Sequence, residues 1–210
     1  MKYKAILFDL DGTLTDPQLG ICQCINHALS FYGMYKPLNE LTKYIGPPLL
    51  DSFAELVGRE NAADAIAKYR ERFSVKGLYE NEIYPDVDRT LQVLKEKGYI
   101  LCTASSKPEI YVKEILRYFN ISKYFDYIGG ATLDGSRGAK SDVIEYVLKQ
   151  VNIDNSQVVM VGDTIFDLEG AQKMNMDAIG VTYGFGAKED LLQYPNIAVI
   201  DSITDILNIL

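Results

Sequence analysis

The sequence predicts an α/β fold: a Rossmann-like doubly wound parallel sheet with an inserted all-helical domain. Short apolar stretches alternate along the chain with stretches whose apolar residues recur every three or four positions, which is typical of strands and helices in a parallel sheet. Between about residues 16 and 80 only the helical spacing appears, interrupted by a Gly-Pro-Pro break. Several apolar stretches also end in acidic or hydroxyl side chains. Ligands of such sheets bind at the carboxyl ends of the strands, so we expect a polar site there.

The individual elements follow from this alternation. The first is a short buried strand over residues 3–9, YKAILFD, which stops at an Asp-Gly turn. Helices are expected where the apolar spacing is three or four, and strands where a short apolar run is bounded by turn residues. The later elements are helices over 17–33, 49–57, 60–77, 85–97, 108–118, 140–150 and 165–174, strands over 99–104, 125–128, 157–162 and 177–181, and a last strand and helix from 197.

The same pattern divides the chain into two domains. Residues 1–15 and 82–210 are assigned to an α/β core domain, and residues 16–81 to a helical domain inserted after its first strand. A chain of 210 residues is long enough for a core with an inserted subdomain.

Composition restricts the class of protein. The chain is 48% hydrophobic and 24% charged, which suits a folded protein. Its net charge of −8 argues against nucleic acid as a partner, because duplex binding needs clustered lysine and arginine. No apolar run approaches the roughly 20 residues of a membrane span, and AILF is too short for a secretory signal. We therefore expect a cytoplasmic protein; the oligomeric state is not visible in the sequence.

Cysteine and histidine are too few for a zinc site. The chain has three cysteines, Cys22, Cys24 and Cys102, and one histidine, His27. A structural zinc ion takes four soft ligands, so buried reduced thiols and a structural histidine are the better interpretation.

The stretch FDLDGTLTD places Asp9 and Asp11 two positions apart at the tip of the first strand. Residues i and i+2 of a strand point to the same face, and two neighbouring carboxylates resist joint ionisation unless a cation compensates them. Gly12 allows a turn that exposes both groups at the strand end. An acidic strand cap is the plain alternative, and the similar pair Asp86 and Asp88 is explained by a helix start.

Other predicted strand ends carry polar groups as well. Ser105 and Ser106 precede a helix start, where hydroxyl and backbone N–H groups can bind an anion, although Ser105 could simply cap the helix. Asp163 and Asp167 follow QVVMVG, and an N-capping Asp163 is the structural alternative. Lys140 begins a helix, a position unfavourable to a cation, which indicates an acidic neighbour or an anionic ligand.

Together these side chains indicate phosphoryl chemistry. Carboxylate oxygens select hard cations such as Mg²⁺, which typically binds through a few protein ligands and substrate phosphate. The hydroxyl and amide cradle and the lysine suit the anionic group of such a substrate.

Four motifs in order resemble those of the haloacid dehalogenase superfamily of phosphohydrolases. They are FDLDGT, a strand ending in Ser105, Lys140 at a helix start, and GDTIFD. The helical insert matches the cap domain of that superfamily. YIGPPL, YPDV, SSKP, LDGSRGAKSDVI and GDTIFDLEGA are most similar to its phosphoglycolate phosphatase-like branch, and within it to members described as 5′-nucleotidases.

The resemblance implies a role for each motif residue. Asp9 would be the nucleophile that forms an aspartyl-phosphate, and Asp11 the general acid and base. Ser105 and the Ser106 amide would hold phosphoryl oxygens while Lys140 stabilises charge. The cap would close over the site and read the leaving group. The residues expected to hold Mg²⁺ are Asp9, Asp11 (through its carbonyl) and Asp163, with Asp167 supporting them through water or Lys140. The residues expected to contact substrate are Gly12, Ser106, Arg137, Gly46 and Pro47, although a plain helix break is an equal alternative for Gly46 and Pro47.

The resulting hypothesis is a Mg²⁺-dependent phosphomonoester hydrolase acting on a nucleoside 5′-monophosphate or phosphoglycolate. A phosphomutase of the β-phosphoglucomutase type shares all four motifs and is the alternative enzyme. A non-catalytic regulatory protein of the same fold is the alternative from another class. A dinucleotide-binding or P-loop protein is disfavoured, because the chain has neither Gly-x-Gly-x-x-Gly nor a P-loop.

Overall fold

The computed structural model describes residues 2–210 and contains two compact units. One unit comprises Ile83–Leu210 with the residues up to Thr15, and the other is Asp16–Glu82. The second boundary therefore lies one residue beyond the predicted one. Each unit has its own buried apolar interior.

The larger unit contains a six-stranded sheet of order β5-β4-β1-β6-β7-β8, in which every neighbouring pair is parallel. Its central strand β1 is buried along its whole length, as its continuous apolar sequence AILF requires of a strand covered on both faces. The predicted doubly wound α/β fold is confirmed. The strands are β1 Ala5–Phe8, β4 Ile100–Pro108, β5 Tyr127–Ala131, β6 Val158–Gly162, β7 Asp177–Val181 and β8 Ala198–Ile200.

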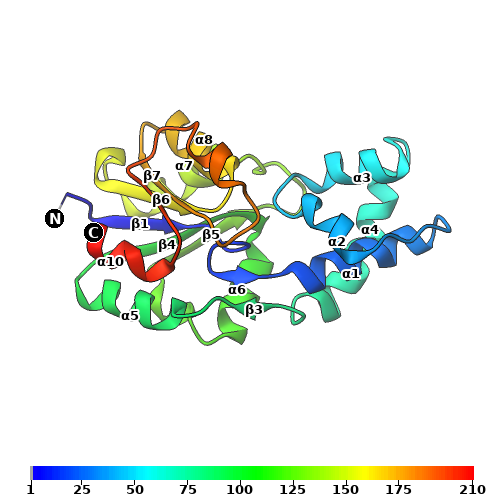
Figure 1. The fold of residues 1–210 in the computed structure, drawn as a ribbon, viewed down its shortest axis with the longest axis horizontal. Helices are drawn as coiled ribbons and strands as arrows, with labels where there is room; N and C mark the ends of the chain where they lie inside the picture. Colours follow the sequence, from blue (N-terminus) through cyan, green and yellow to red (C-terminus); the bar gives the residue numbers. More distant parts are fainter. Residues whose placement is uncertain (1) are drawn as a thin grey trace. The chain divides into compact units, whose positions relative to one another are not determined.

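Helices cover both faces of this sheet. Helices α7 and α8 lie on one face, and α5, α6 and α10 on the other (Figure 1). On the first face, side chains such as Leu7, Val143 and Met160 form one buried apolar layer between helix and sheet. The helices are α5 Val87–Glu96, α6 Glu109–Tyr118, α7 Lys140–Val151, α8 Ile165–Lys173, α9 Lys188–Leu191 and α10 Ile206–Ile209.

The smaller unit is helical, and its interior is built on aromatic contacts. Phe53 packs edge-on against Tyr69 at a centroid distance of 5.9 Å, and Tyr69 stacks on Phe73 at 5.3 Å. Short strands β2 and β3 at the unit boundaries form a separate two-stranded sheet. The elements are β2 Thr15–Asp16, α1 Gln18–Ser30, α2 Leu38–Leu41, α3 Leu49–Val57, α4 Ala62–Arg72 and β3 Glu82–Ile83, with a 3₁₀ turn at Thr42–Tyr44.

Several predicted element ends were wrong. The helix expected over 60–77 ends at Arg72 and continues as a π-helical turn, Phe73–Gly77. The strand expected to stop at residue 104 runs on to Pro108. The prediction that Asp86 and Asp88 lie at a helix start is confirmed: Asp86, with a φ of 61°, is the N-cap residue of α5, although its side chain makes no capping bond, and Asp88 lies in the first turn. Helices α2 and α9, of four residues each, were too short to show a periodic pattern.

Candidate active site

The chain leaves β1 at Asp9 and turns sharply. The backbone N–H of Asp9 donates to the Val161 carbonyl at 2.9 Å, which fixes the tip of β1 beside β6. Gly12 has a φ of +79°, and its N–H donates to Thr15 at 2.8 Å. A Cβ atom at Gly12 would lie 2.1 Å from an oxygen of Asp163, so both backbone conformation and close approach require glycine there.

Lys140, at the start of α7, is enclosed between two carboxylates. Its Nζ lies 2.9 Å from Asp9 and 2.7 Å from Asp167, and donates to the Ala104 carbonyl at 3.0 Å. Burial disfavours the ammonium, but the nearby charges of Asp167 and Asp9 outweigh that effect and raise the pKa of Lys140 above its ordinary value. Lys140 is therefore a fixed cation in this group.

Asp163, directly after β6, is fully buried. One of its oxygens accepts from the Thr13 hydroxyl at 3.2 Å, and the other from the backbone N–H of Phe185 at 2.8 Å. Burial, followed by the charges of Asp167 and Asp9, raises the pKa of Asp163 well above its usual range. No cation of the described residues 2–210 forms an ion pair with this carboxylate.

Asp167 is held by the first turn of α8. Its Oδ2 accepts from the backbone N–H and the hydroxyl of Thr164, at 3.0 and 2.9 Å, in a capping box. The structural alternative for Asp163 was therefore wrong, because Thr164 is the N-cap residue. Burial raises the pKa of Asp167 to about 6, although Lys140 opposes that shift.

When all three carboxylates are ionised, this group carries two negative charges in excess of the one lysine. Ligand oxygens of Asp9, Asp163 and Asp167 all lie within 4.8 Å of one another. Hard oxygen donors in a buried, negatively charged group are the set that a divalent cation such as Mg²⁺ prefers. The residues present therefore fit a divalent metal.

Ser105 and Lys107 lie on the buried side of the end of β4. Ser105 and Lys107 are buried and Ser106 between them is exposed, which is the alternation of a strand. The pairing of β4 with β5 is irregular between Ser105 and Pro108. Ser105 Oγ accepts from the backbone N–H of Lys107 at 3.3 Å. Pro108 is the N-cap residue of α6, so the interpretation of Ser105 as a helix cap was wrong.

Asp11 is not part of the acidic cluster but pairs with Lys107. Burial raises the pKa of Asp11, and the neighbouring Lys107 charge opposes that shift. No role had been predicted for Lys107. Its position two residues after Ser105 on the same strand was the signal that could have found it.

The loop after β7 closes over Asp163 and was also missed. Tyr183 donates its hydroxyl proton to the Thr13 carbonyl at 3.0 Å. A Cβ at Gly184 would lie 2.4 Å from Asp163 and one at Gly186 would lie 2.0 Å from its carbonyl oxygen. Two glycines closely following a buried strand were the signal for this approach.

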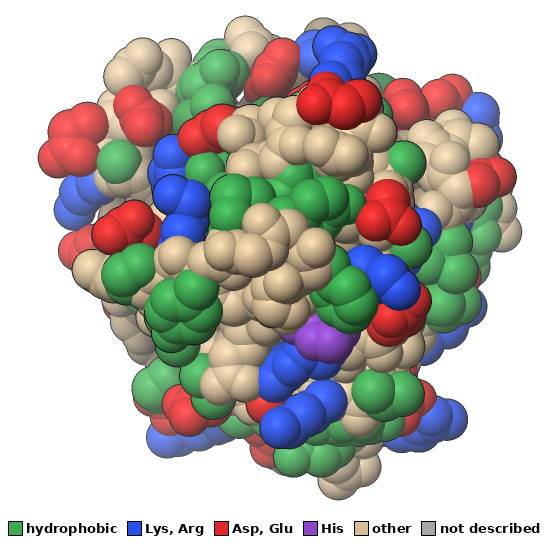
Figure 2. Space-filling view, turned by 90° about the vertical axis from the view of Figure 1, so that its right-hand side faces the viewer, with side chains coloured by type: hydrophobic (Ala, Val, Ile, Leu, Met, Phe, Trp, Pro, Cys, Tyr) green, Lys and Arg blue, Asp and Glu red, His purple; other side chains and the backbone are tan. Residues whose placement is uncertain are grey.

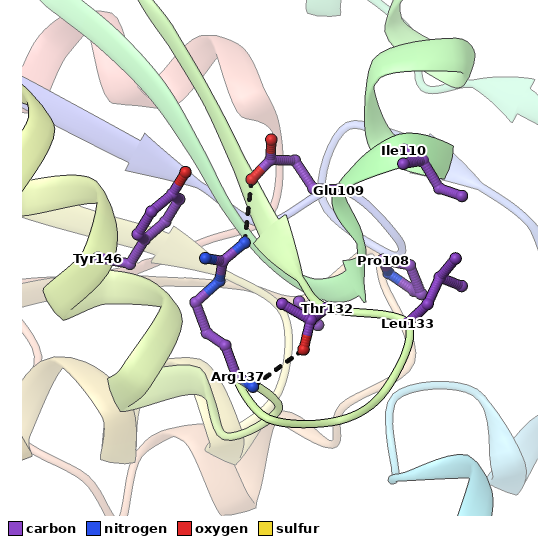
Figure 3. A pocket seen from close by; sticks show the side chains of 8 residues that line it. Pro108, Glu109, Ile110, Thr132, Leu133, Arg137 and Tyr146 are labelled. Atoms are coloured by element: carbon purple, nitrogen blue, oxygen red, sulfur yellow. Dashed lines mark hydrogen bonds and ion pairs between the residues drawn. The ribbon is translucent and has the colours of Figure 1, made fainter.

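Arg137 makes its contacts outside the acidic cluster. Its guanidinium pairs with Glu109 at 3.1 Å, donates to the Gly130 carbonyl at 2.9 Å, and lies 3.6 Å from the ring centre of Tyr146 (Figure 3). Arg137, Glu109 and Tyr146 line a pocket of about 270 Å³, together with Pro108, Ile110, Ala131, Thr132 and Leu133. None of the clustered acids lines this pocket, and a substrate contact by Arg137 stays a prediction.

The remaining candidates lie in the helical unit. Gly46 adopts a φ of +103°, and Pro47 follows it before α3. Their contact with substrate stays a prediction. His27 packs edge-on against Phe31 at 5.4 Å, and all three cysteines are buried thiols.

Within residues 2–210, no helix combines the length and the apolarity that crossing a bilayer requires. On the face shown in Figure 2, lysine and arginine side chains are interspersed with aspartate and glutamate.

Comparison with known proteins gives consistent matches. A family model described as haloacid dehalogenase-like hydrolase matches residues 6–181. A 5′-nucleotidase of Pseudomonas aeruginosa is 41% identical over 194 residues, covering 91% of this chain and 88% of the relative. The tyrosine-protein kinase PtkA of Mycobacterium tuberculosis is 35% identical, covering 98% of this chain and 73% of the relative. The crystal structure of a predicted phosphatase from Clostridium acetobutylicum superposes with a TM-score of 0.94 at 39% identity, covering 99% and 98% of the two chains.

Proposed function

We propose, from the premise that this chain belongs to the haloacid dehalogenase-like hydrolases, that it hydrolyses nucleoside 5′-monophosphates with Mg²⁺ through an aspartyl-phosphate. The chain is a phosphatase of this family; its metal, intermediate and substrate are what we propose. The observation that carries the proposal is the buried group of three carboxylates and one lysine at the carboxyl ends of β1 and β6.

In the proposed reaction Asp9 is the nucleophile. Its carboxylate oxygen forms a bond to phosphorus while the bond from phosphorus to the ester oxygen breaks, and Asp11 gives its proton to the departing oxygen. In the second step Asp11 takes a proton from water as the water oxygen bonds to phosphorus. The bond to Asp9 then breaks, and inorganic phosphate leaves with both aspartates restored.

Lys140 keeps Asp9 in place for this attack. Its ammonium contacts Asp9 at 2.9 Å and is itself anchored by Asp167 and the Ala104 carbonyl. A cation fixed this way stabilises negative charge on the phosphoryl group without having to reorganise during the reaction. The proposed metal ligands are the carboxylates of Asp9, Asp163 and Asp167 and the carbonyl of Asp11. When bound, the metal supplies the positive charge that neutralises phosphoryl oxygens in reactions of this kind.

Ser105 is oriented as a donor to the phosphoryl group. Its oxygen already accepts from the Lys107 N–H, so its hydroxyl proton can be directed to an oxygen of the substrate. The backbone N–H of Ser106 is the second donor in the proposed cradle.

The substrate class rests on the relatives. The relative at 41% identity is named a 5′-nucleotidase, and it covers most of both chains. Phosphoglycolate, which the sequence motifs also suggested, is the competing substrate. Both are alkyl phosphates whose leaving oxygen needs a proton, which is the task proposed for Asp11.

A phosphate-release screen tests the proposal. Purified enzyme is incubated with Mg²⁺ and a panel of nucleoside 5′-monophosphates, phosphoglycolate, sugar phosphates and pyrophosphate, with Asp9→Asn as the blank. We expect turnover that is fastest on nucleoside 5′-monophosphates, is lost with chelator, and falls by roughly 10⁴-fold or more in Asp9→Asn. Near-normal phosphate release by that variant, or activity that survives chelation, contradicts the proposal.

The same intermediate could instead be opened by an alcohol. A phosphomutase would return the phosphoryl group to a sugar, and the relative named a tyrosine-protein kinase points to a tyrosine hydroxyl as a further acceptor. Two parallel reactions separate these cases: glucose 1-phosphate followed for the 6-phosphate, and ATP with a tyrosine-containing peptide followed for phosphopeptide. If more phosphate is transferred to the sugar or to the peptide than is released as inorganic phosphate, the enzyme is a phosphotransferase and the proposed hydrolase activity is wrong.

A further inference from the structure

Lys107 is a buried cation that the mechanism above uses only through its backbone. Its ammonium pairs with Oδ2 of Asp11, and the two side chains are 6% and 17% exposed. Removing two charges from water is costly, so a buried ion pair of this kind has to be explained by packing or by function.

The second oxygen of Asp11 is left without a protein partner. Among residues 2–210, Asp11 Oδ1 is buried and makes no hydrogen bond. A buried carboxyl oxygen is normally paired, because leaving it unpaired costs free energy. Lys107 therefore restrains one oxygen of Asp11 while the other faces no protein donor.

Lys107 connects the turn after β1 to the end of β4. It lies 96 positions from Asp11 in the sequence, and its backbone N–H also donates to Ser105 Oγ. The irregular pairing between Ser105 and Pro108 lies at this point of β4. Irregularities of this type redirect side chains near active sites.

We propose that Lys107 is a positioning residue that holds the Asp11 carboxyl so that its unpaired oxygen exchanges protons with the leaving group and with water. This inference rests on the proposed function. In the first step the proton moves from Asp11 to the ester oxygen as the bond between phosphorus and that oxygen breaks. In the second step the same carboxyl takes a proton from the attacking water. Lys107 thus matters most where the leaving oxygen has to be protonated.

The effect of a Lys107 variant on kcat/KM should depend on the leaving group if Lys107 positions the general acid, and should be the same for all substrates if Lys107 only supports the fold. The alkoxide of an alkyl phosphate needs a proton to depart, whereas p-nitrophenolate departs without one. For Lys107→Met we expect kcat/KM on the fastest alkyl phosphate of the screen to fall by about 10²-fold, the order that a general acid contributes. On p-nitrophenyl phosphate we expect a fall of less than about fivefold. Asp11→Asn is expected to show the same pattern.

The comparison does not depend on how much of a variant folds. Both substrates are assayed on the same preparation, so the fraction of folded enzyme cancels from the ratio of the two losses. Lys107→Arg keeps a cation and should recover part of the loss on the alkyl phosphate. Lys149→Met removes an exposed lysine paired with Glu145 and should leave both rates unchanged.

A double variant tests whether the two residues act as a unit. If Lys107 acts through Asp11, adding Lys107→Met to Asp11→Asn lowers the alkyl phosphate rate by less than about threefold further. Equal losses on both substrates, no loss at all, or a fully additive double variant overturns the role of Lys107. If the wild-type enzyme hydrolyses no phosphomonoester of either kind, it is the proposed function that fails.

Discussion

Each unit of the molecule contains a buried or partly buried group of charges, and the two groups differ in how well their charges balance. In the helical unit, Arg72 pairs with both oxygens of Glu80, at 2.7 and 2.9 Å, and also donates to Gln23 and Cys24. In the α/β unit, Lys140 pairs with Asp9 and Asp167, whereas the clustered Asp163 has no ion-pair partner within residues 2–210. A balanced pair can hold a fold together, whereas an uncompensated buried carboxylate needs a further cation or a proton. Charge imbalance, more than burial, therefore distinguishes the candidate functional site.

Asp163→Asn removes one negative charge from the acidic cluster and should have the largest effect. We expect it to lower the activity and to maintain or raise the stability of the metal-free protein. The amide oxygen of the introduced asparagine can still accept from the Phe185 N–H, so packing is kept while one charge is lost. We expect phosphate release to fall by roughly 10²–10³-fold, while the metal-free variant unfolds at the same or higher urea concentration than wild type.

Magnesium binding gives the second measurement on this variant. A cation at about a hundred times its dissociation constant stabilises a folded protein by about 2.7 kcal/mol. The urea midpoint of the wild type should therefore rise when Mg²⁺ replaces chelator, and that of Asp163→Asn should rise much less. An equal rise in both proteins contradicts the proposed ligand set.

Arg72→Met breaks the balanced pair and should act on stability. The variant leaves Glu80 partly buried and without its principal partner, which we expect to cost about 2–3 kcal/mol. Replacing both residues, in Arg72→Met/Glu80→Leu, should cost less than the single change because no unpaired charge remains. The free energy of unfolding in urea measures both. A double variant less stable than Arg72→Met argues that the pair is held by more than charge.

The pH dependence of stability tests the excess of negative charge in the acidic cluster without a mutation. The folded pKa of Asp167 is about 6 against an ordinary value of 3.8, so between these values the folded state binds more protons than the unfolded state. Without metal, stability should therefore fall by about 1–3 kcal/mol as pH rises from 5 to 7.5. The raised pKa values of Asp163 and Asp11 act in the same direction.

Exposed carboxylates do not contribute to the change in stability expected between pH 5 and 7.5. The pKa values of Asp177 and Asp201 are lowered, so their stabilisation is complete above the unfolded value of about 4 and is lost only at lower pH. Urea midpoints at pH 5 and 7.5 in chelator, compared with those in Mg²⁺, provide the test. A metal-free midpoint that rises over this range is the contrary result.

Breaking an exposed ion pair should change the free energy of unfolding least, and it serves as the reference for the buried groups. Lys149 lies 2.7 Å from Glu145 one turn earlier in α7, with both side chains more than half exposed. Lys149→Ala should change the free energy of unfolding by about 0.3–0.5 kcal/mol. A change above about 1 kcal/mol in urea unfolding would mean that surface pairs weigh more in this protein than the comparison assumes.

The sequence by itself determined the architecture and the end of the sheet where the charged side chains lie. AILF before Asp9 and VVMVG before Asp163 are apolar enough to be buried strands. The carboxyl ends of parallel strands share one edge, so acids that follow such strands come together without knowledge of any loop. Element ends were less predictable, because the π-helical turn after Arg72 and the extension of β4 to Pro108 depend on neighbouring segments.

Only the tertiary structure decided which polar groups contact one another at the carboxyl-terminal edge of the sheet. Asp11 pairs with Lys107, 96 positions away, and Thr13 reaches Asp163 across 150 positions. Such contacts depend on the irregular end of β4 and on the path of the glycine loop after β7, and neither leaves a local periodic signal. Hydrophobic periodicity records which face of a strand or helix is buried, whereas the partner of a polar side chain is set by the few ångströms of backbone path that tertiary packing selects.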